Sequence, residues 1–599
     1  MKTQKQSKAQ GKKPTSLNVL WMEMALLTIG CLIAYQPVYS NALIDWDDLK
    51  YITQNAITQD LSFQGLVNMF RTPVMGNYHP LTMLSLALNF KLSGDSAFAY
   101  HFTNLLLHIA NSVLVLLVVQ ALGLSRVVGR TAAILFALHP LHVESVAWAA
   151  ERKDVLYTCF ALLSWLYFLK FRQAEVPSWK WYGVSIFFFV CACLSKGMAV
   201  TLPVLLVSGE FLCKGKDAVL SALRWIFPFI AISFGFGWVA IWAQEIQGGM
   251  DIQYDLDVLT RVLIALRGYW FYLQQTFWPI GLSPIYPYPA SVPQLPIIWY
   301  VQILLALALI GFGMFQSWKD KRVGFVLLGY SGVIFPVLQI LPVGDAVAAD
   351  RYFYLASVPV FIGLGMLWDF TRNRWGKSIL TPSLLLVLVM AGLTWFQSGL
   401  WKDEVRLFEH AVKHYPESAV AWNNLGAMFQ RKEKFAEAIP YYEKAIALRP
   451  EYTIALCNLG ISYGRTGNME KAIQLLQKSI GTDSTHAESY GNLGNAYVMT
   501  GRREEALQLF TRAVALNPRY VEAWYNLGIY YRENKNPQKA AEFFKKSVAI
   551  RNQFPEGWWS LSAVLFESGD QAGAIEAART SARQGNPAAS EWLRVNKIN

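Results

Sequence analysis

Long apolar segments dominate the first two thirds of the chain and decide its fold class. Each approaches the ~20 mostly apolar residues that an α-helix needs to cross a bilayer. The pattern predicts an all-α, multi-spanning membrane domain over residues 17–400, with a long first outer loop at residues 40–97 and a basic tail at residues 1–16. The eleven apolar segments are residues 17–39, 98–123, 130–149, 154–172, 181–195, 198–213, 222–243, 298–317, 323–341, 352–370 and 378–398.

The last third of the chain follows a different period. Leu-Gly pairs recur every 34 residues, and small residues recur at a second position of the same unit. This period identifies tetratricopeptide repeats, in which each unit is a pair of helices. Residues 401–599 are therefore predicted to form an α-solenoid whose concave surface binds an extended partner. The pairs are Leu425-Gly426, Leu459-Gly460, Leu493-Gly494 and Leu527-Gly528.

Charges between the apolar segments alternate along the chain. Basic clusters such as residues 319–322 are followed by acidic or mixed loops such as residues 345–351. By the positive-inside rule, this predicts a cytoplasmic N-terminus and extracytoplasmic repeats. Residues 258–280 break the alternation. We expect them to dip into the membrane and return, which leaves eleven crossings; a full crossing, the alternative, would invert every later loop.

The amino-acid composition further narrows the class of protein. The chain is 54% hydrophobic and only 16% charged, against about 25% charged in soluble proteins. Its net charge of +12 does not indicate nucleic-acid binding, because the basic residues flank apolar segments and no nucleic-acid-binding motif is present. The six cysteines show neither a disulfide framework nor zinc spacing.

The first outer loop carries the most unusual polar residues. Asp45, Asp47 and Asp48 lie within four residues, and Tyr78-His79 follows later in the loop. Clustered carboxylates repel one another, so a divalent cation, a basic partner or a role as a base would suit them. A solvated acidic turn is the alternative.

Two further groups of polar residues are expected on the same outer face. His139, His142 and Glu144 lie late in an apolar segment, where polar groups are costly and usually functional. A metal site with these residues stays open, although no third ligand is specified, and a hydrogen-bonded polar patch is the alternative. Several basic side chains are suited to bind an anionic lipid headgroup. Each of them alone could instead extend its charged end to the membrane–water interface. They are Arg152, Lys153, Lys196, Arg267 and Arg351, accompanied by the acids Asp154, Asp345 and Asp350.

Several of these motifs resemble the transmembrane and tetratricopeptide-repeat O-mannosyltransferases and their bacterial relatives, within the wider GT-C fold of polyprenyl-phosphate-sugar glycosyltransferases. The resemblance implies that Asp47 and Asp48 are the acid pair of the site, with Asp47 catalytic. It also implies that Arg152, Asp154 and Arg351 match residues near the lipid phosphate. The motifs are Asp47-Asp48, Tyr51-Ile52, Asn55, Tyr78-His79-Pro80-Leu81-Thr82, Asn89 and Leu138-His139-Pro140-Leu141-His142-Val143-Glu144.

The chain departs from the animal members of that family in two ways. His79 stands where an arginine is expected, and the repeat array is short. These departures leave the donor sugar and the acceptor open. With the short N-terminus, they favour a protein of the bacterial inner membrane.

The implied function is transfer of a sugar from a polyprenyl-phosphate donor to an acceptor hydroxyl, on a protein held by the repeats, at the extracytoplasmic face with inversion. The lipid-linked sugar would be the co-substrate, and a divalent cation stays open. Two alternatives remain: a polymerase or ligase of surface polysaccharide, and a non-enzymatic membrane scaffold built on the repeats.

Overall fold

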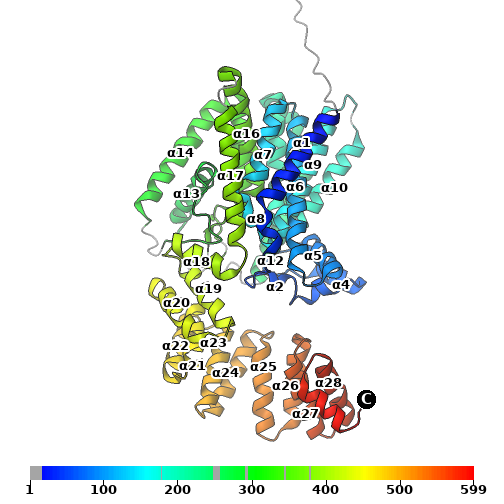
Figure 1. Ribbon diagram of the computed structural model, residues 1–599, viewed down its shortest axis with the longest axis vertical. Coiled ribbons are helices and arrows are strands. Elements are labelled where there is room, and N and C mark those ends of the chain that lie inside the picture. Colours follow the sequence, from blue (N-terminus) through cyan, green and yellow to red (C-terminus); the bar gives the residue numbers. More distant parts are fainter. Residues whose placement is uncertain are drawn as a thin grey trace, which may run out of the picture. The chain divides into compact units, whose positions relative to one another are not determined.

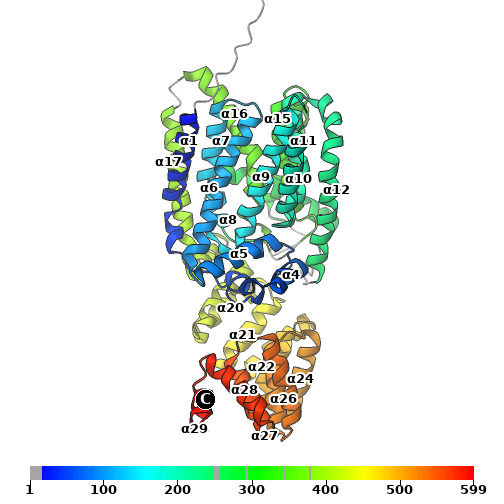
Figure 2. The ribbon, with the colours of Figure 1, turned by 90° about the vertical axis from the view of Figure 1, so that its right-hand side faces the viewer.

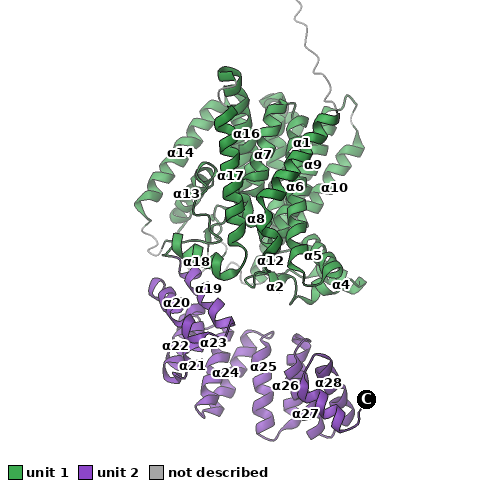
Figure 3. Ribbon diagram, viewed as in Figure 1, with its two compact units in different colours: residues 1–417 green, residues 418–599 purple. Residues whose placement is uncertain are grey.

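The protein folds as two compact units, residues 1–417 (unit 1) and residues 418–599 (unit 2), coloured separately in Figure 3. The computed structural model describes residues 17–176, 178–246, 256–289, 295–342, 344, 346–376 and 380–598. The predicted basic tail, residues 1–16, and Asp345 lie outside these described residues.

Unit 1 is a bundle of helices that run mostly along one direction (Figures 1 and 2). One end of this bundle carries the short helices of residues 40–97, and we call it the loop end. Its α-helices are α1 (Leu17–Ala34), α2 (Asp48–Tyr51), α3 (Ala56–Gln59), α4 (Phe63–Arg71), α5 (Pro80–Ser93), α6 (Ala97–Ala121), α7 (Arg126–Leu138), α8 (Val143–Ala147), α9 (Arg152–Gln173), α10 (Trp179–Cys193), α11 (Leu202–Lys214), α12 (Lys216–Ile246), α13 (Val258–Phe277), α14 (Ile297–Ser317), α15 (Lys321–Ile334), α16 (Phe353–Trp375), α17 (Leu380–Leu400) and α18 (Glu404–His414).

Short elements join these helices near the loop end. Two strands, β1 (Tyr286–Pro287) and β2 (Ala346–Ala348), pair antiparallel. The 3-10 turns are η1 (Gln36–Ser40), η2 (Pro140–His142), η3 (Ala149–Glu151), η4 (Gly197–Thr201), η5 (Phe335–Val337) and η6 (Asp350–Tyr352).

Seven helical segments of the described chain are long and apolar enough to cross a membrane, and two shorter apolar helices accompany them. The seven are Ala97–Ala121, Ala149–Gln173, Gly197–Lys214, Val219–Ile246, Ile297–Ser317, Asp350–Trp375 and Leu380–Leu400, and the shorter two are Asn18–Ala34 and Trp179–Cys193. This pattern is that of a membrane protein, whereas the number of eleven crossings and their orientation stay predictions.

The predicted helix at residues 130–149 is wrong as a single element. Helix α7 ends at Leu138, and Pro140 opens the turn η2. Proline has no backbone N–H and fits the first position of a helix far better than its interior. His139 and His142 therefore lie in a break between helices rather than on one helical face.

Helix α13 enters unit 1 from the loop end, and the chain returns there. The preceding helix α12 ends at the loop end, where Gln244 lies beside Gly76. The following helix α14 finishes at the opposite end, where Lys321, just beyond it, donates to the Cys213 carbonyl. The neighbouring helices α12 and α14 thus both reach α13 from the loop end. Strand β1, which pairs with β2, lies in the segment that leads from α13 back to that end.

The division between the units falls later than residue 400, where the repeats were expected to begin. Helix α18 packs in unit 1 through the first outer loop. The backbone N–H of Trp46 donates to Glu404 at 2.9 Å, and the Trp46 and Phe408 rings lie 5.4 Å apart between centroids. Unit 2 begins with the first complete helix pair.

Unit 2 is a series of helix pairs followed by one terminal helix. The repeated Leu-Gly pairs have a packing reason: a Cβ on Gly494 would come within 2.6 Å of the Phe510 ring in the second helix of the same pair. Only glycine allows so close an approach. The helices are α19 (Ala419–Arg431), α20 (Phe435–Leu448), α21 (Thr453–Arg465), α22 (Met469–Thr482), α23 (Ala487–Met499), α24 (Arg503–Leu516), α25 (Val521–Glu533), α26 (Pro537–Ile550), α27 (Pro555–Glu567), α28 (Gln571–Arg583) and α29 (Pro587–Val595).

Candidate active site at the loop end of unit 1

The two neighbouring acids of the first outer loop have different surroundings. Asp48 is fully buried, and its carboxylate accepts hydrogen bonds from the backbone N–H groups of Ile44 (2.8 Å) and Ala150 (2.7 Å). Burial raises the pKa of Asp48 to about 7, although these two hydrogen bonds oppose the rise. Asp48 thus ties the loop to the start of α9, which is a positioning role.

Asp47 is the acid with a free carboxylate. It stands at the N-terminal end of α2, is half-buried, and its side chain accepts no hydrogen bond from the part of the chain that the structure describes. Desolvation raises its pKa, opposed mainly by the nearby ammonium of Lys153. Asp45, also half-buried, precedes it. A desolvated carboxylate with open lone pairs can accept a proton or a ligand hydroxyl.

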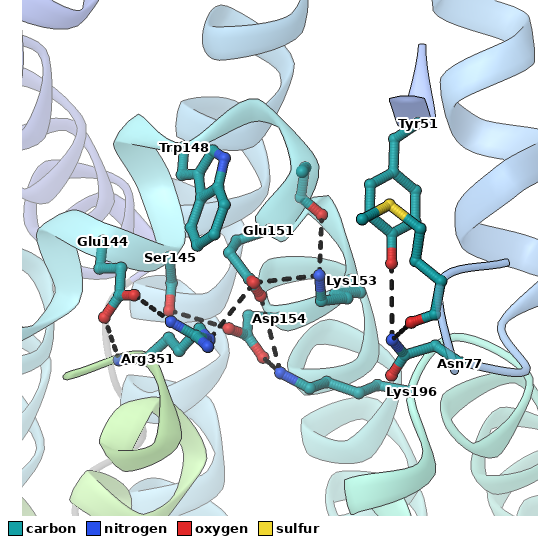
Figure 4. A network of polar contacts seen from close by, with 12 residues as sticks. Tyr51, Asn77, Glu144, Ser145, Trp148, Glu151, Lys153, Asp154, Lys196 and Arg351 are labelled. Atoms are coloured by element: carbon teal, nitrogen blue, oxygen red, sulfur yellow. Dashed lines mark hydrogen bonds and ion pairs between the residues drawn. The ribbon is translucent and has the colours of Figure 1, made fainter. Parts of the chain in front are cut away.

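Figure 4 shows a buried ion network around Glu151. Three of its members, Lys153, Glu151 and Arg351, act electrostatically on Asp47. Its centre is Glu151, whose carboxylate oxygens lie 3.0 Å from the Lys153 ammonium, 3.7 Å from that of Lys196 and 3.4 Å from Nε of Arg351. The Glu151 side chain is only 2% exposed. One carboxylate therefore faces three cations, and each depends on it.

Two further ion pairs lie at the edge of the network. Arg351 forms an ion pair with Glu144, which also accepts the backbone N–H of Arg351 at 2.9 Å. Lys196 pairs with Asp154. Three cations thus face the three carboxylates of Glu144, Glu151 and Asp154, so the network is close to neutral. Because η6 and α9 come from distant parts of the chain, it also holds the loop end together.

Arg152 does not lie where a lipid phosphate could reach it, contrary to the expectation from the sequence. It is fully buried, and its guanidinium donates to the side chains of Asn104, Ser85 and Asn89 and to the Tyr100 carbonyl. These acceptors use four of its five N–H groups. Arg152 therefore clamps α5, α6 and α9 together.

The two histidines of the helix break are bound within the protein. His139 lies 3.0 Å from the Thr276 carbonyl and accepts the Leu141 N–H, whereas His142 contacts the Phe136 carbonyl and the Ser357 hydroxyl. Throughout the described ranges, no group of three His, Cys, Asp or Glu residues could hold a metal ion. The hydrogen-bonded polar patch is thus the reading that the geometry favours for this pair.

His79, unlike His139 and His142, is not hydrogen-bonded to any described residue. It is buried against the Tyr51 ring, yet neither ring nitrogen has a hydrogen-bond partner among the described residues. Burial and the charge of Lys153 lower the pKa of His79 to about 3, so the ring is neutral. Its neighbour Tyr78 points elsewhere and donates to the Phe70 carbonyl at 3.0 Å. A neutral imidazole beside Lys153 can accept or donate one hydrogen bond to a bound molecule.

Arg267 is a second buried arginine with no carboxylate partner. Its guanidinium lies 4.5 Å from the ring centroids of both Phe271 and Trp299, and its Nε and Nη1 have no hydrogen-bond partner in the described chain. The Phe271 ring contacts the Tyr286 ring at 4.7 Å, and the Tyr286 hydroxyl donates to Asp350 at 2.7 Å. Arg267 is therefore linked to the network through residues beside Arg351, and its open donors suit an anion.

An apolar groove lies along α13 beyond Arg267, which is not itself part of the groove wall. Its volume is about 650 Å³, and α13, α14, α15 and α16 line it. Trp270 and Gln274, one and two turns beyond Arg267 on α13, lie at its wall, followed by Leu309 and Phe312 on α14. A long apolar chain fits such a groove, whose wall also includes the charged residues Asp320 and Arg322.

Sequence reasoning missed Glu151 as the centre of the network, although it singled out the next three residues, Arg152, Lys153 and Asp154. It also missed the neutral partners of Arg152. The charge of Glu151 directly before two cationic residues, Arg152 and Lys153, was a usable signal, whereas Asn104 and Ser85 look like ordinary polar residues of apolar helices.

Comparisons with known proteins agree with this architecture. Residues 77–242 match the family model described as dolichyl-phosphate-mannose-protein mannosyltransferase. Three matches to tetratricopeptide-repeat models cover residues 417–484, 453–519 and 492–555. The chain joins a mannosyltransferase-type membrane segment to tetratricopeptide repeats. The predicted all-α fold class is thereby confirmed.

Several relatives are similar over most of the chain. Protein O-mannosyl-transferase TMTC3 of Mus musculus is 27% identical over 408 residues, which cover 61% of this chain and 44% of that protein. TMTC4 of Mus musculus is 26% identical, covering 61% and 57%, and Tmtc1 of Drosophila melanogaster is 24% identical, covering 68% and 60%. The chain thus spans about half the length of the curated relatives it matches. The predicted resemblance to this family is confirmed.

Solved structures of other proteins are similar to part of the chain. A crystal structure of MamA is 29% identical and covers 27% of this chain and 94% of the MamA chain, with a TM-score of 0.24.

Proposed function

We propose that this membrane protein transfers a sugar from a polyprenyl-phosphate donor to a hydroxyl of an acceptor protein, at the extracytoplasmic face and with inversion at the anomeric carbon. The observation that carries the proposal is the half-buried Asp47 carboxylate, which has open lone pairs and lies beside the buried ion network. The relatives named as protein O-mannosyl-transferases support the reaction class.

In the proposed reaction, the acceptor oxygen bonds to the anomeric carbon as the bond from that carbon to the phosphate oxygen breaks. Asp47 takes the proton of the acceptor hydroxyl, and the polyprenyl phosphate leaves with the electron pair. Desolvation makes Asp47 a better base, because it raises the pKa of the carboxyl towards neutrality. A single displacement inverts the anomeric centre.

The donor lipid is assigned to the groove beside Arg267. The cations of the network already face carboxylates, and Arg152 donates to neutral groups, whereas Arg267 has two N–H groups without partners in the described chain. A phosphate there would satisfy them, and the isoprenoid tail would follow the apolar wall of α13 to α16. The Arg267 guanidinium would then stabilise the negative charge that develops on the leaving phosphate.

The test is transfer by Asp47→Asn, with polyprenyl-phosphate mannose as donor and a Ser/Thr-rich peptide as acceptor. Loss of the base should lower the rate by about 10²–10⁴-fold while the unfolding temperature stays unchanged. Asp95→Asn is the matched control, because Asp95 is an exposed acid of the same outer loop. Full activity in Asp47→Asn would sink the assignment of the base.

A further inference from the structure

A groove opens in unit 2 between α26 and α28, the second helices of the last two helix pairs. Its volume is about 440 Å³, which lies in the size range of ligand pockets. Trp558 and Leu565 of α27 contribute apolar side chains to it. Its charged lining residues are Lys545 on α26, Asp570 just before α28, and Glu576 on α28. The groove is therefore an apolar hollow with two acids along one wall.

The groove exists because a large side chain is missing from the last pair. The repeat spacing of 34 residues makes Ala577 of α28 the counterpart of Phe543 in α26. The Phe543 ring stacks on Trp524, 5.7 Å away between centroids, and on Tyr531, 5.3 Å away. Trp558 and Leu565 are the counterparts of those two residues, and they line the groove with Ala577. The residues at this position in the earlier pairs are Tyr441, Leu475, Leu509 and Phe543.

The first helix pair shows the same aromatic arrangement. The Tyr441 ring stacks on Trp422 at 6.2 Å and on Phe429 at 5.1 Å between centroids. Two pairs of unit 2 thus place an aromatic ring against two aromatic rings of the first helix. The last pair keeps a tryptophan and a leucine for such a ring to pack on, without the ring.

The preceding pair also supplies a cation that has no counterpart in the last pair. The Lys546 ammonium lies 5.4 Å from the centroid of the Phe543 ring and 2.8 Å from the Glu542 carboxylate. The counterpart of Glu542 is Glu576, whereas that of Lys546 is Thr580. Glu576 is exposed, and its carboxylate has no hydrogen bond or ion pair with the residues that the structure describes. The groove therefore offers an apolar hollow and a free carboxylate side by side.

We infer that this groove binds a helix of a partner protein that carries an aromatic residue followed three positions later by a lysine or arginine. Phe543 and Lys546 have this spacing, at which two side chains share one face of a helix. The partner ring would pack between Trp558 and Leu565, and its cation would lie beside Glu576. The partner helix supplies the two groups that α26 supplies in the preceding pair. This site lies between second helices of unit 2 and does not depend on the proposed sugar transfer.

The experiment uses the full chain in lipid nanodiscs and a fluorescent, helix-stapled peptide with the sequence of residues 537–550, which carries the ring and the lysine at this spacing. The same peptide with Phe543→Ala should bind about tenfold more weakly or worse, because the ring supplies most of the apolar area of the contact. Equal binding of the two peptides overturns the inference, as does absence of binding to the wild type. This comparison needs no change in the protein.

The second arm changes the groove itself. Ala577→Phe supplies the missing ring from the chain and should weaken binding of the parent peptide by about tenfold or more. Ala572→Phe is the matched control, because it adds the same ring at an exposed position of α28 outside the groove lining, and it should bind as the wild type does. Glu576→Gln should weaken binding by about two- to fivefold, since the ion pair would be exposed.

The unfolding temperatures of both phenylalanine variants show whether each still folds. Unchanged peptide binding by a folded Ala577→Phe variant overturns the inference. If that variant does not fold, the comparison of the two peptides on the wild type decides.

Discussion

Ion pairs occur in both units of this protein, but those of the unit 1 network are buried, whereas those of unit 2 are exposed. In unit 1, the side chains of Glu151 and Lys153 are 2% and 8% exposed, whereas in unit 2 those of Glu567 and Arg532 are 42% and 43% exposed. Desolvation of a buried charge is expensive, so a buried pair is weak grounds for inferring stability and stronger grounds for inferring a role. Exposed pairs in water contribute little.

The two units also differ in which parts of the chain supply the partner of each charged side chain. The buried network of unit 1 joins charges from α8, η3, α9, η6 and the residue before η4, so no short piece of chain can form it. Unit 2 places its pairs within one helix or between neighbouring helices. The charges of unit 1 therefore depend on one another, and those of unit 2 do not.

The largest effect is expected for Glu151→Gln. Without this carboxylate, Lys153, Lys196 and Arg351 stay buried with one partner fewer, and breaking a buried pair in this way costs about 3–5 kcal/mol. The measurement is the free energy of unfolding of the full chain in detergent. A loss below about 1 kcal/mol would mean that water reaches the network and that the contrast between the units is false.

The two buried arginines of unit 1 sharpen the comparison within that unit. Arg267→Gln should weaken binding of polyprenyl-phosphate mannose by about 2–5 kcal/mol, because a desolvated anion would lose its cation. Arg152→Gln should instead lower the unfolding temperature and leave donor affinity per folded molecule unchanged. Donor binding to each purified variant in nanodiscs checks this, and the reverse result would restore Arg152 as the phosphate ligand.

The difference between local contacts in unit 2 and long-range contacts in unit 1 explains which features could be predicted from the sequence. The period of 34 residues predicts unit 2 because each repeat reports its own structure. In unit 1, apolar length predicts most of the helices, and the acidic loop locates Asp47. The helix break at Pro140 was visible in the sequence but overridden by the apolar run. The partners of Arg152 could not be predicted, because Asn104 and Ser85 become acceptors only when distant helices pack.

Asp48 predicts a pH dependence that is confined to unit 1. Burial raises its pKa to about 7, above the ordinary carboxyl value, so the folded state binds a proton that the unfolded state does not bind between about pH 4 and pH 7. Stability should therefore rise as the pH falls from about 7 to 5.

The measurement is the unfolding temperature of unit 1 across that pH window in the wild type and in Asp48→Asn. The variant should show a flatter profile, because it has no proton to bind at this position. It should also be less stable overall, since its amide has one acceptor oxygen for the two N–H groups of Ile44 and Ala150. An equal slope in both proteins would assign the pH dependence to another group.

The smallest effect is expected for the exposed pair of Arg532 and Glu567, whose closest atoms lie 2.7 Å apart between neighbouring repeats. A double-mutant cycle of Arg532→Ala and Glu567→Ala should give a coupling energy of about 0.2–1 kcal/mol that shrinks with added salt. The same cycle on Glu151 and Lys153 should give a larger value with little dependence on salt, since buried charges are weakly screened. Both cycles are measured by unfolding of the full chain. If the exposed pair couples as strongly as the buried one, then burial does not distinguish the two units, and the network of unit 1 loses its claim to a special role.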